Sequence, residues 1–139
     1  RRLRPDVAFG ADLIAGFPTE TDEMFAGSEH LIGDCGLTYL HVFPYSPRPG
    51  TPAAKMPQVA RDVVKARAAV LRDKGATRLG LRLDRHVGQT TLALVEAGDR
   101  ARLSDFAPVR IEGISPEAGR PALFNLVSRN ATELVGRPA

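Results

Sequence analysis

The chain has 139 residues, of which 43% are hydrophobic and 25% are charged, and its net charge at pH 7 is +3. This composition is typical of a soluble globular protein with one domain, or with part of a larger domain followed by a small second one. The single cysteine, Cys35, excludes an internal disulfide and a metal site built from several cysteines of this chain. The single cysteine also fits a reducing cytoplasm, so we expect a cytoplasmic protein. No apolar run approaches the roughly 18 residues that span a bilayer, so we expect no membrane segment.

The first part of the chain predicts a strand, a helix and a second strand. The near-continuous apolar run 7–17 predicts a strand buried on both faces, as in a parallel sheet. A helix over residues 21–36 follows, and Thr21 or Asp22 can cap it. The next β-prone run is 37–43, so the sequence predicts a βαβ unit with two parallel strands.

Two unusual loops follow these strands, the turn 16–21 and the proline-rich segment 43–53. Ligands of parallel α/β folds bind beyond the carboxyl ends of the strands, so we expect both loops at one rim. Arg48 lies between Pro47 and Pro49, and its backbone therefore loses little freedom when the side chain binds. A preorganised arginine suits a phosphate or a carboxylate, although the prolines could instead form only a rigid bridge between elements.

From Gln58 the pattern predicts a helix of about 25 residues, which Gly75 and Gly80 are expected to break or bend near its far end. Its expected apolar stripe consists of Val59, Val63, Ala66 and Val70, continued by Leu71. Between Arg61 and Arg85 there are eight basic and three acidic residues, so the positive charge is concentrated on this helix. The basic side chains could lie against phosphates, or they could form a solvated face opposite the stripe.

After His86 the chain changes to short β-prone runs separated by Gly, Pro and Asn. Their spacing of about ten residues predicts about five antiparallel strands in a small closed barrel. We place the domain boundary there, so that residues 1–86 form the α/β part with its basic connecting helix and residues 87–139 form the barrel.

Two segments carry a family resemblance: GADLIAGFPTETDEMF, residues 10–25, and YLHVFPYSPRPGTPAAKM, residues 39–56. Together they resemble the second half of the catalytic barrel of radical-SAM tRNA methylthiotransferases, and the branch that acts on threonylcarbamoyladenosine is the most similar. Residues 87–96, VGQTTLALVE, resemble the start of the TRAM domain of these enzymes. The resemblance covers nearly the whole chain. It implies the C-terminal part of a radical-SAM partial (β/α) barrel with parallel strands, followed by a small antiparallel β-barrel of TRAM or OB-like type.

The resemblance also implies an activity. Such enzymes methylthiolate C2 of N6-threonylcarbamoyladenosine 3′ to the anticodon, at tRNA position 37, with S-adenosylmethionine and two 4Fe–4S clusters. Their partners are S-adenosylmethionine and the tRNA anticodon stem-loop. The CxxxCxxC motif and the other cluster cysteines are absent from this chain, so we expect it to supply no metal ligand and no catalytic residue, and to be inactive alone.

By the same resemblance, the residues that border the cofactor lie at the two strand ends. They are Gly16, Phe17, Pro18, Glu20, Val42, Phe43, Tyr45, Ser46 and Arg48. Radical-SAM enzymes often carry a Gly-x-Ile-x-Gly-x-x-Glu motif on a comparable strand. Here the spacing from Gly16 to Glu20 is one residue longer and Asp12 replaces the first Gly. The open alternatives are a tight turn with Glu20 near a helix N-terminus, and ordinary barrel core at Val42 and Phe43.

The residues expected to contact RNA combine charge with aromatic stacking. They are Arg48, Arg100, Arg102, Phe106, Arg110 and Arg129. Other side chains are expected to be structural: Phe124 in the core, Cys35 as a small buried hydrophobe, and His30 and His41 without metal-binding spacing.

Several functions remain open at this point. The first is the threonylcarbamoyladenosine enzyme, with a methylthiotransferase acting on isopentenyladenosine in tRNA or on a ribosomal protein as its nearest alternatives. The second is a non-catalytic RNA-binding module that consists of the basic helix and the barrel. The third is a complete α/β enzyme or scaffold whose loops merely resemble the family.

Overall fold

A computed structural model describes residues 2–4 and 6–139 of the chain. Its packing forms two compact units, which we call the α/β unit and the barrel unit. The α/β unit comprises Phe9–Arg78, and the barrel unit comprises Leu79–Ala139 together with the described residues before Phe9. The domain boundary expected between residues 86 and 87 stays a prediction.

The elements of the α/β unit follow the expected order. They are β1 (Phe9–Ala15), α1 (Asp22–Asp34), β2 (Leu37–Pro44), a short 3-10 helix (Ala53–Lys55) and the first part of α2 (Arg61–Asp84). The Thr21 side chain caps α1 by accepting a hydrogen bond from the Met24 N–H, which leaves fewer unpaired N–H groups at the first turn.

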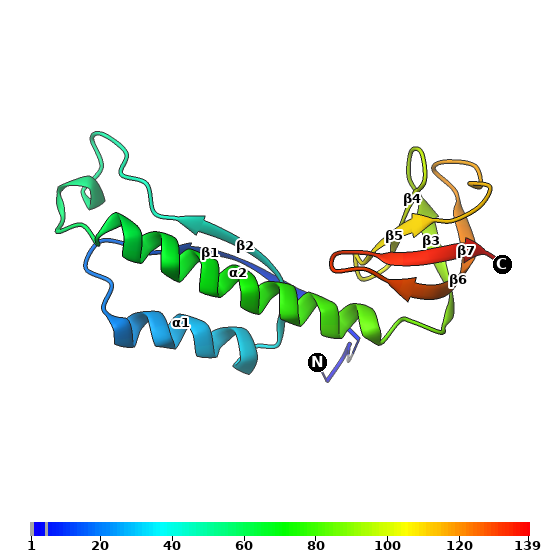
Figure 1. Ribbon diagram of the computed structural model, residues 1–139, viewed down its shortest axis with the longest axis horizontal. Coiled ribbons are helices and arrows are strands. Elements are labelled where there is room, and N and C mark those ends of the chain that lie inside the picture. Colours follow the sequence, from blue (N-terminus) through cyan, green and yellow to red (C-terminus); the bar gives the residue numbers. More distant parts are fainter. Residues whose placement is uncertain (1, 5) are drawn as a thin grey trace. The chain divides into compact units, whose positions relative to one another are not determined.

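β1 and β2 form a parallel pair, as the βαβ pattern predicts, and their arrowheads point to the same end of the sheet (Figure 1). Along the sheet Asp12 lies opposite His41, and Ile14 lies opposite Phe43. The side chains on one face pack against the helices in a small core. This core contains Ala11, Leu13, Ala15, Leu40 and Val42 from the strands, and Phe25, Ile32, Ala68 and Leu71 from the helices.

The other face of the β1–β2 sheet is open. Ile14 and Phe43 on this face remain 53% and 52% exposed. The prediction of a strand buried on both faces is therefore wrong for this chain, because the helices of the α/β unit cover only one face.

Helix α2 is continuous from Arg61 to Asp84, so the expected break at Gly75 and Gly80 does not occur. Both glycines instead permit a close approach. A Cβ at Gly75 would lie 3.2 Å from the Leu40 side chain, and a Cβ at Gly80 would lie 3.4 Å from the Arg129 guanidinium. Packing at these two positions offsets the low helix propensity of glycine.

The buried stripe of α2 also differs from the expectation. Val63 is half-buried and Ala66 and Val70 are exposed, whereas the buried positions from Arg61 to Gly75 are Val64, Arg67, Ala68, Leu71 and Gly75. Val63 and Val64 are both apolar, so the period alone does not distinguish two stripes that differ by one residue. The sequence favoured the stripe without a charge, while the fold buries the one that contains Arg67.

The barrel unit contains five strands, as predicted. They are β3 (Thr90–Val95), β4 (Arg100–Leu103), β5 (Pro108–Ile111), β6 (Pro121–Arg129) and β7 (Leu134–Pro138). They close in the order β3-β4-β5-β7-β6 (Figure 1). The expectation of an antiparallel barrel is wrong for one pair, because β5 and β7 are parallel. A ring with an odd number of strands cannot alternate direction at every step, so one neighbouring pair has to be parallel.

The interior of the barrel is apolar and closely packed, and it includes Leu83 from the last turn of α2. The buried residues are Leu83, Ala93, Val95, Ala101, Leu103, Ala107, Val109, Ile111, Phe124, Leu126 and Leu134. Phe124 is fully buried, as predicted. A Cβ at Gly136 would lie only 2.8 Å from Cγ1 of Val109, so glycine lets β7 approach this core.

Asp105 connects the end of α2 to the β4–β5 turn. Its Oδ2 accepts hydrogen bonds from Arg82 at 2.6 Å and from His86 at 2.8 Å, and its Oδ1 accepts one from the Ala107 N–H at 3.2 Å. Burial alone would raise the pKa of Asp105, but these three bonds outweigh it and hold the pKa well below its usual range.

Asp105→Asn should lower the free energy of unfolding by about 2 kcal/mol at pH 7, because Arg82 and His86 lose their anionic acceptor. The pKa of Asp105 is lowered by folding, so its contribution is complete above the pKa of a free aspartate, about 3.9. That contribution is lost as the pH falls through the folded-state pKa. Urea denaturation followed by circular dichroism should therefore show a gap between wild type and variant that narrows below about pH 4.

Asp99→Asn is the matched control, because Asp99 is exposed in the same unit. It should change the free energy of unfolding by less than about 0.5 kcal/mol. A gap for Asp105→Asn that stays constant from neutral to acid pH would contradict the role assigned to the carboxylate.

Candidate functional site at the ends of the parallel strands

The two unusual loops meet beyond the carboxyl ends of β1 and β2. The Tyr45 N–H donates to the Ala15 carbonyl at 2.8 Å, which extends the pairing of the strands past their last residues. The rings of Phe17 and Tyr45 lie edge to face with centroids 5.4 Å apart. The prediction that the loops lie at one rim of a parallel sheet is confirmed.

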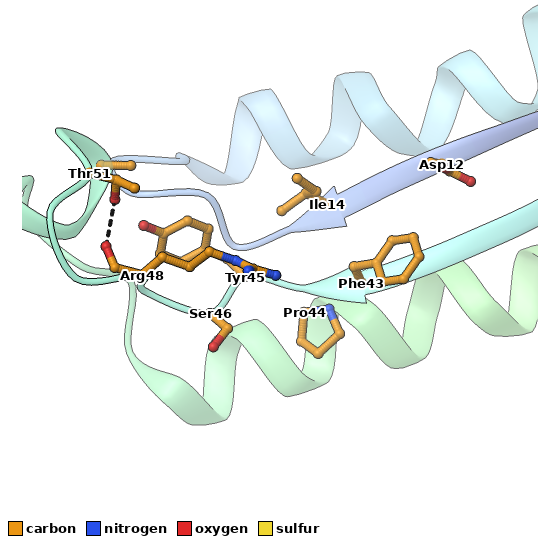
Figure 2. Close-up of a pocket in the computed structure, with 9 residues that line it drawn as sticks. Asp12, Ile14, Phe43, Pro44, Tyr45, Ser46, Arg48 and Thr51 are labelled. Atoms are coloured by element: carbon orange, nitrogen blue, oxygen red, sulfur yellow. Dashed lines mark hydrogen bonds between the residues drawn. The ribbon is translucent and has the colours of Figure 1, made fainter.

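A hollow of about 630 Å³ lies over the open face of the sheet and continues to this rim. Figure 2 shows Asp12 and Ile14 along β1, Phe43 and Pro44 at the end of β2, and the loop residues that follow. The full lining is Asp12, Ile14, Phe43, Pro44, Tyr45, Ser46, Arg48, Thr51 and Ala53. Its volume falls in the range of small-molecule sites, roughly 300–1,000 Å³.

The nine residues predicted to border a cofactor fall into two groups. Phe43, Tyr45, Ser46 and Arg48 line the hollow. Gly16, Phe17, Pro18, Glu20 and Val42 are not part of its lining, and Val42 packs on the helix-covered face of the sheet. The role of all nine toward a cofactor stays a prediction.

The Arg48 segment is ordered by a local turn. The Arg48 carbonyl accepts hydrogen bonds from the Thr51 N–H at 3.2 Å and from the Thr51 hydroxyl at 2.8 Å (Figure 2, dashed). Within the described residues, the exposed Arg48 side chain makes no hydrogen bond or ion pair, and the buried Tyr45 hydroxyl has no hydrogen-bond partner. The loop therefore presents a guanidinium at the edge of the hollow that no described residue neutralises.

Gly16 is required by the packing of the protein itself. Its φ of +72° lies in the left-handed region, and an added Cβ would lie 2.4 Å from Cγ2 of Val64 on α2. The Gly16 N–H donates to the Glu20 carboxylate at 2.9 Å. Close approach at this glycine is thus explained by helix α2, without a ligand.

Glu20 is held by an arginine that the sequence analysis missed. Arg67 of α2 donates to the Glu20 carboxylate at 2.7 Å and to the Glu20 carbonyl at 3.0 Å, and these two side chains are only 8% and 10% exposed. Arg67 also donates to Asp22 at 2.6 Å, and its guanidinium lies over the Phe25 ring. The position of Arg67 between Val64 and Ala68 on the buried stripe is the signal that could have identified it.

Three further basic residues of α2 also contact the protein itself. Arg72 donates to the Val42 carbonyl and Arg78 to the Leu37 carbonyl, at 3.1 and 3.3 Å, while Lys74 pairs with Glu29 at 3.0 Å. Neither alternative for the basic helix, phosphate contact or a freely solvated face, describes these side chains. Much of the positive charge of α2 therefore lies on side chains that bind the β1–β2 sheet and α1.

The residues predicted to contact RNA in the barrel are mostly engaged in ion pairs. Arg102 donates twice to Glu96, at 2.6 and 3.2 Å, and Arg129 twice to Asp84, at 2.6 and 2.8 Å. These bonds lower the pKa of each carboxyl group. A weaker pair joins Arg110 to Glu133 at 3.8 Å.

Arg100 and Phe106 are the two predicted RNA contacts that remain accessible. The Arg100 side chain is exposed and makes no hydrogen bond or salt bridge within the part of the chain that the structure describes. Phe106 is 69% exposed and has a φ of +68°, which is unusual for an aromatic residue. Of the six predicted RNA contacts, these two side chains and Arg48 of the α/β unit have no ion pair to break among the described residues.

The described residues do not fit an iron–sulfur cluster. Cys35 is exposed after the end of α1, so the expectation of a small buried hydrophobe is wrong. The described residues contain no group of three or more His, Cys, Asp or Glu side chains that could hold a metal ion. Among them, none of the helices is long and apolar enough to cross a membrane.

Comparison with known proteins assigns a family, although no family model matches the chain. The chain is 51% identical over 112 residues, 81% of its length, to the threonylcarbamoyladenosine tRNA methylthiotransferase MtaB of Rickettsia prowazekii. It is also 34% identical over 137 residues, 98% of its length, to the tRNA-2-methylthio-N(6)-dimethylallyladenosine synthase of Chromohalobacter salexigens. The chain belongs to the tRNA methylthiotransferase family.

A further member, the tRNA-2-methylthio-N(6)-dimethylallyladenosine synthase of Shewanella oneidensis, is 36% identical over 146 residues. The chain spans 27% of the Rickettsia protein and 29% and 31% of the other two. The family resemblance inferred from residues 10–25 and 39–56 is confirmed, and it refers to about three-tenths of the length of these relatives.

Arg67→Ala should lower the free energy of unfolding by about 3 kcal/mol, because the Glu20 carboxylate would remain buried without a counter-charge. Lys65→Ala is the control, because Lys65 is exposed on the same helix, and its effect should stay below about 0.5 kcal/mol. Urea denaturation measures both changes, and hydrogen exchange should show faster exchange of the Gly16 amide in Arg67→Ala. Equal effects of the two variants would contradict the role of Arg67.

Proposed function

We propose that this chain is the carboxyl-terminal part of an enzyme that methylthiolates C2 of N6-threonylcarbamoyladenosine 3′ to the anticodon of tRNA, in the cytoplasm. The observation that carries this proposal is the 51% identity to MtaB over 81% of the chain, against 34% and 36% to dimethylallyladenosine synthases over nearly the whole chain and 47% over 53% of it. In this proposal the C-terminal part of a radical-SAM partial barrel precedes a TRAM-like domain, and residues outside the printed chain hold the two 4Fe–4S clusters.

The hollow over the open face of the β1–β2 sheet is the part of this chain that we assign to S-adenosylmethionine. Ile14 and Phe43 offer an apolar floor to a flat base, and Ser46 offers a hydroxyl. Arg48 at the rim suits the methionyl carboxylate, since a guanidinium binds a carboxylate through two parallel hydrogen bonds. When bound, S-adenosylmethionine and the clusters supply the radical chemistry and the sulfur that modify adenine C2.

The residues that do not line the hollow have a positioning role in this proposal. Arg67 and Glu20 fix the turn after β1, so that the Phe17 ring supports Tyr45 from outside the hollow. A rim held in this way keeps Arg48 and Ser46 near their bound positions and reduces the entropy lost when a ligand is ordered.

The barrel unit is the part that we assign to docking of the tRNA anticodon stem-loop. Arg100 and Phe106 are accessible for a phosphate contact and for stacking on an unpaired base. The other three predicted contacts are held in ion pairs on the barrel unit: Arg102, Arg110 and Arg129. In this proposal each of them contacts RNA only if a phosphate replaces its carboxylate partner.

The test of the proposed function is nucleoside mass spectrometry of tRNA from a strain that lacks the gene for the full-length protein. We expect the 2-methylthio form of N6-threonylcarbamoyladenosine to disappear while the unmethylthiolated nucleoside accumulates. If the 2-methylthio form of N6-dimethylallyladenosine disappears instead, the enzyme belongs to the dimethylallyladenosine branch of the family. If the deletion leaves the tRNA unchanged, although the full-length protein binds iron and S-adenosylmethionine, the proposal is overturned.

Arg48→Ala in the full-length holoenzyme should weaken S-adenosylmethionine binding by about 10- to 100-fold, because a hydrogen-bonded charge pair is worth about 1.5–3 kcal/mol. Lys55→Ala, on the 3-10 helix that follows this loop, should leave the dissociation constant within about two-fold. Isothermal titration calorimetry measures both constants. An unaltered constant in Arg48→Ala would remove Arg48 from the cofactor site.

Arg100→Ala should weaken tRNA binding and reduce the slope of log K against log salt by about one, because one phosphate contact is lost. Arg129→Ala should instead destabilise the barrel unit, because Arg129 braces it through Asp84. Binding isotherms at several salt concentrations, together with melting temperatures, separate the two effects. An Arg100→Ala variant with wild-type affinity and salt dependence would exclude this contact.

A further inference from the structure

Two polar residues lie on the open face of the β1–β2 sheet, two positions farther from the rim along each strand than Ile14 and Phe43. Asp12 of β1 and His41 of β2 are partners in the parallel register, and both are exposed. Their neighbours Leu13 and Val42 point to the helix-covered core, so alternation along the strands places Asp12 and His41 on the open face. Sequence reasoning assigned neither residue to a site and expected His41 to be structural.

Neither side chain makes a hydrogen bond or ion pair within the described residues. Two other carboxylates of the α/β unit, those of Glu20 and Glu29, pair with Arg67 and Lys74. Asp12 lines the hollow, on β1 beyond Ile14 and farther from the Arg48 loop (Figure 2). His41 is not among the residues that line the hollow, but it is the register partner of Asp12 on the neighbouring strand, and strands of one sheet lie about 4.8 Å apart.

This pair complements a ligand group that has both hydrogen-bond donors and an acceptor with negative charge. A carboxylate only accepts hydrogen bonds, whereas an imidazole N–H donates one. A threonylcarbamoyl substituent contains N–H and hydroxyl donors together with a carbonyl and a carboxylate. A dimethylallyl substituent consists of hydrocarbon alone, and beside these two side chains it would leave both polar groups without partners.

We infer that Asp12 and His41 recognise the N6 substituent of the target adenosine and so determine the specificity for threonylcarbamoyladenosine. Asp12 accepts hydrogen bonds from the N–H or hydroxyl groups of the substituent, and His41 donates to its carboxylate or carbonyl. This inference rests on the proposed function, because it takes the target nucleoside to enter the same hollow.

The arrangement of the hollow agrees with this division of roles. Residues two apart on a strand lie about 6.7 Å apart. Asp12 and His41 therefore lie about that far from Ile14 and Phe43 along the strands, on the side away from the rim. The apolar row nearer the rim is the one assigned to the flat base of S-adenosylmethionine, while the polar row suits a hydrophilic group of a second ligand, the target nucleoside. A ligand that covers Asp12 and His41 excludes water from them, so a substituent without hydrogen-bonding groups leaves both unpaired, and such sites typically discriminate more strongly than a hydrophobic pocket does.

The test uses the full-length holoenzyme with S-adenosylhomocysteine bound, and fluorescence anisotropy of labelled anticodon stem-loops. One stem-loop carries N6-threonylcarbamoyladenosine and the other carries plain adenosine at the same position. The variants are Asp12→Ala and His41→Ala, which remove the acceptor and the donor, and the matched control is Asp34→Ala on the exposed end of α1.

Each site variant should bind the modified stem-loop about 10- to 100-fold more weakly, because a hydrogen bond to a charged group is lost. Binding of the plain stem-loop and of S-adenosylhomocysteine should stay within about two-fold of wild type, and Asp34→Ala should match wild type with every ligand. Retained affinity for S-adenosylhomocysteine also shows that the variants are folded.

Three results would overturn the inference. Equal weakening with both stem-loops would make the pair a general RNA contact, and weaker binding of S-adenosylhomocysteine would place Asp12 or His41 in the cofactor site. A site variant that still prefers the modified stem-loop as wild type does would exclude recognition of the substituent.

Failure of the proposed function gives a different pattern. In that case the wild-type enzyme shows no preference for the modified stem-loop, and tRNA from the deletion strain keeps its 2-methylthio group. That result overturns both proposals, whereas a wild-type preference that the variants retain overturns only the role of Asp12 and His41.

Discussion

The ion pair between Arg67 and Glu20 is the interaction on which the rim of the candidate site depends. It joins α2 to the turn after β1 in a nearly solvent-free position, and the same Glu20 carboxylate holds the Gly16 N–H. A buried charge pair of this kind adds little stability over an apolar contact, but losing one partner is costly. The turn therefore has one well-defined geometry, and Tyr45 packs against the Phe17 that this turn positions.

The β1–β2 sheet divides its side chains into two sets with separate tasks. Helices α1 and α2 cover one face with an apolar core, while the opposite face carries the hollow with Ile14, Phe43 and Asp12. Residues next to each other in sequence thus lie on opposite faces of the sheet: Val42 packs in the core, and Phe43 is available to a ligand. A sheet face with a charged residue and an exposed aromatic ring is unusual in a protein core, and it is ordinary in a binding site.

Charge in this chain works mainly within the protein. Arginines of α2 and of the barrel are tied to carboxylates or backbone carbonyls, for example Arg78 to Leu37 and Arg129 to Asp84. The basic total of the sequence therefore overstates the charge that is available for RNA. Electrostatic attraction of tRNA depends on the cations that make no internal hydrogen bond or salt bridge among the described residues, such as Arg48 and Arg100, rather than on the sum.

The sequence by itself determined the order of elements, the parallel pair, the five-stranded barrel and the family, because these follow from local periodicity, turn residues and two long motifs. The tertiary structure decided which side chains share a space. Val63 and Val64 give the same helical period, so only packing showed that the buried stripe of α2 contains Arg67. Likewise, the pairing of Asp12 with His41 depends on the register of two strands 29 positions apart in the chain, and no local pattern specifies that register.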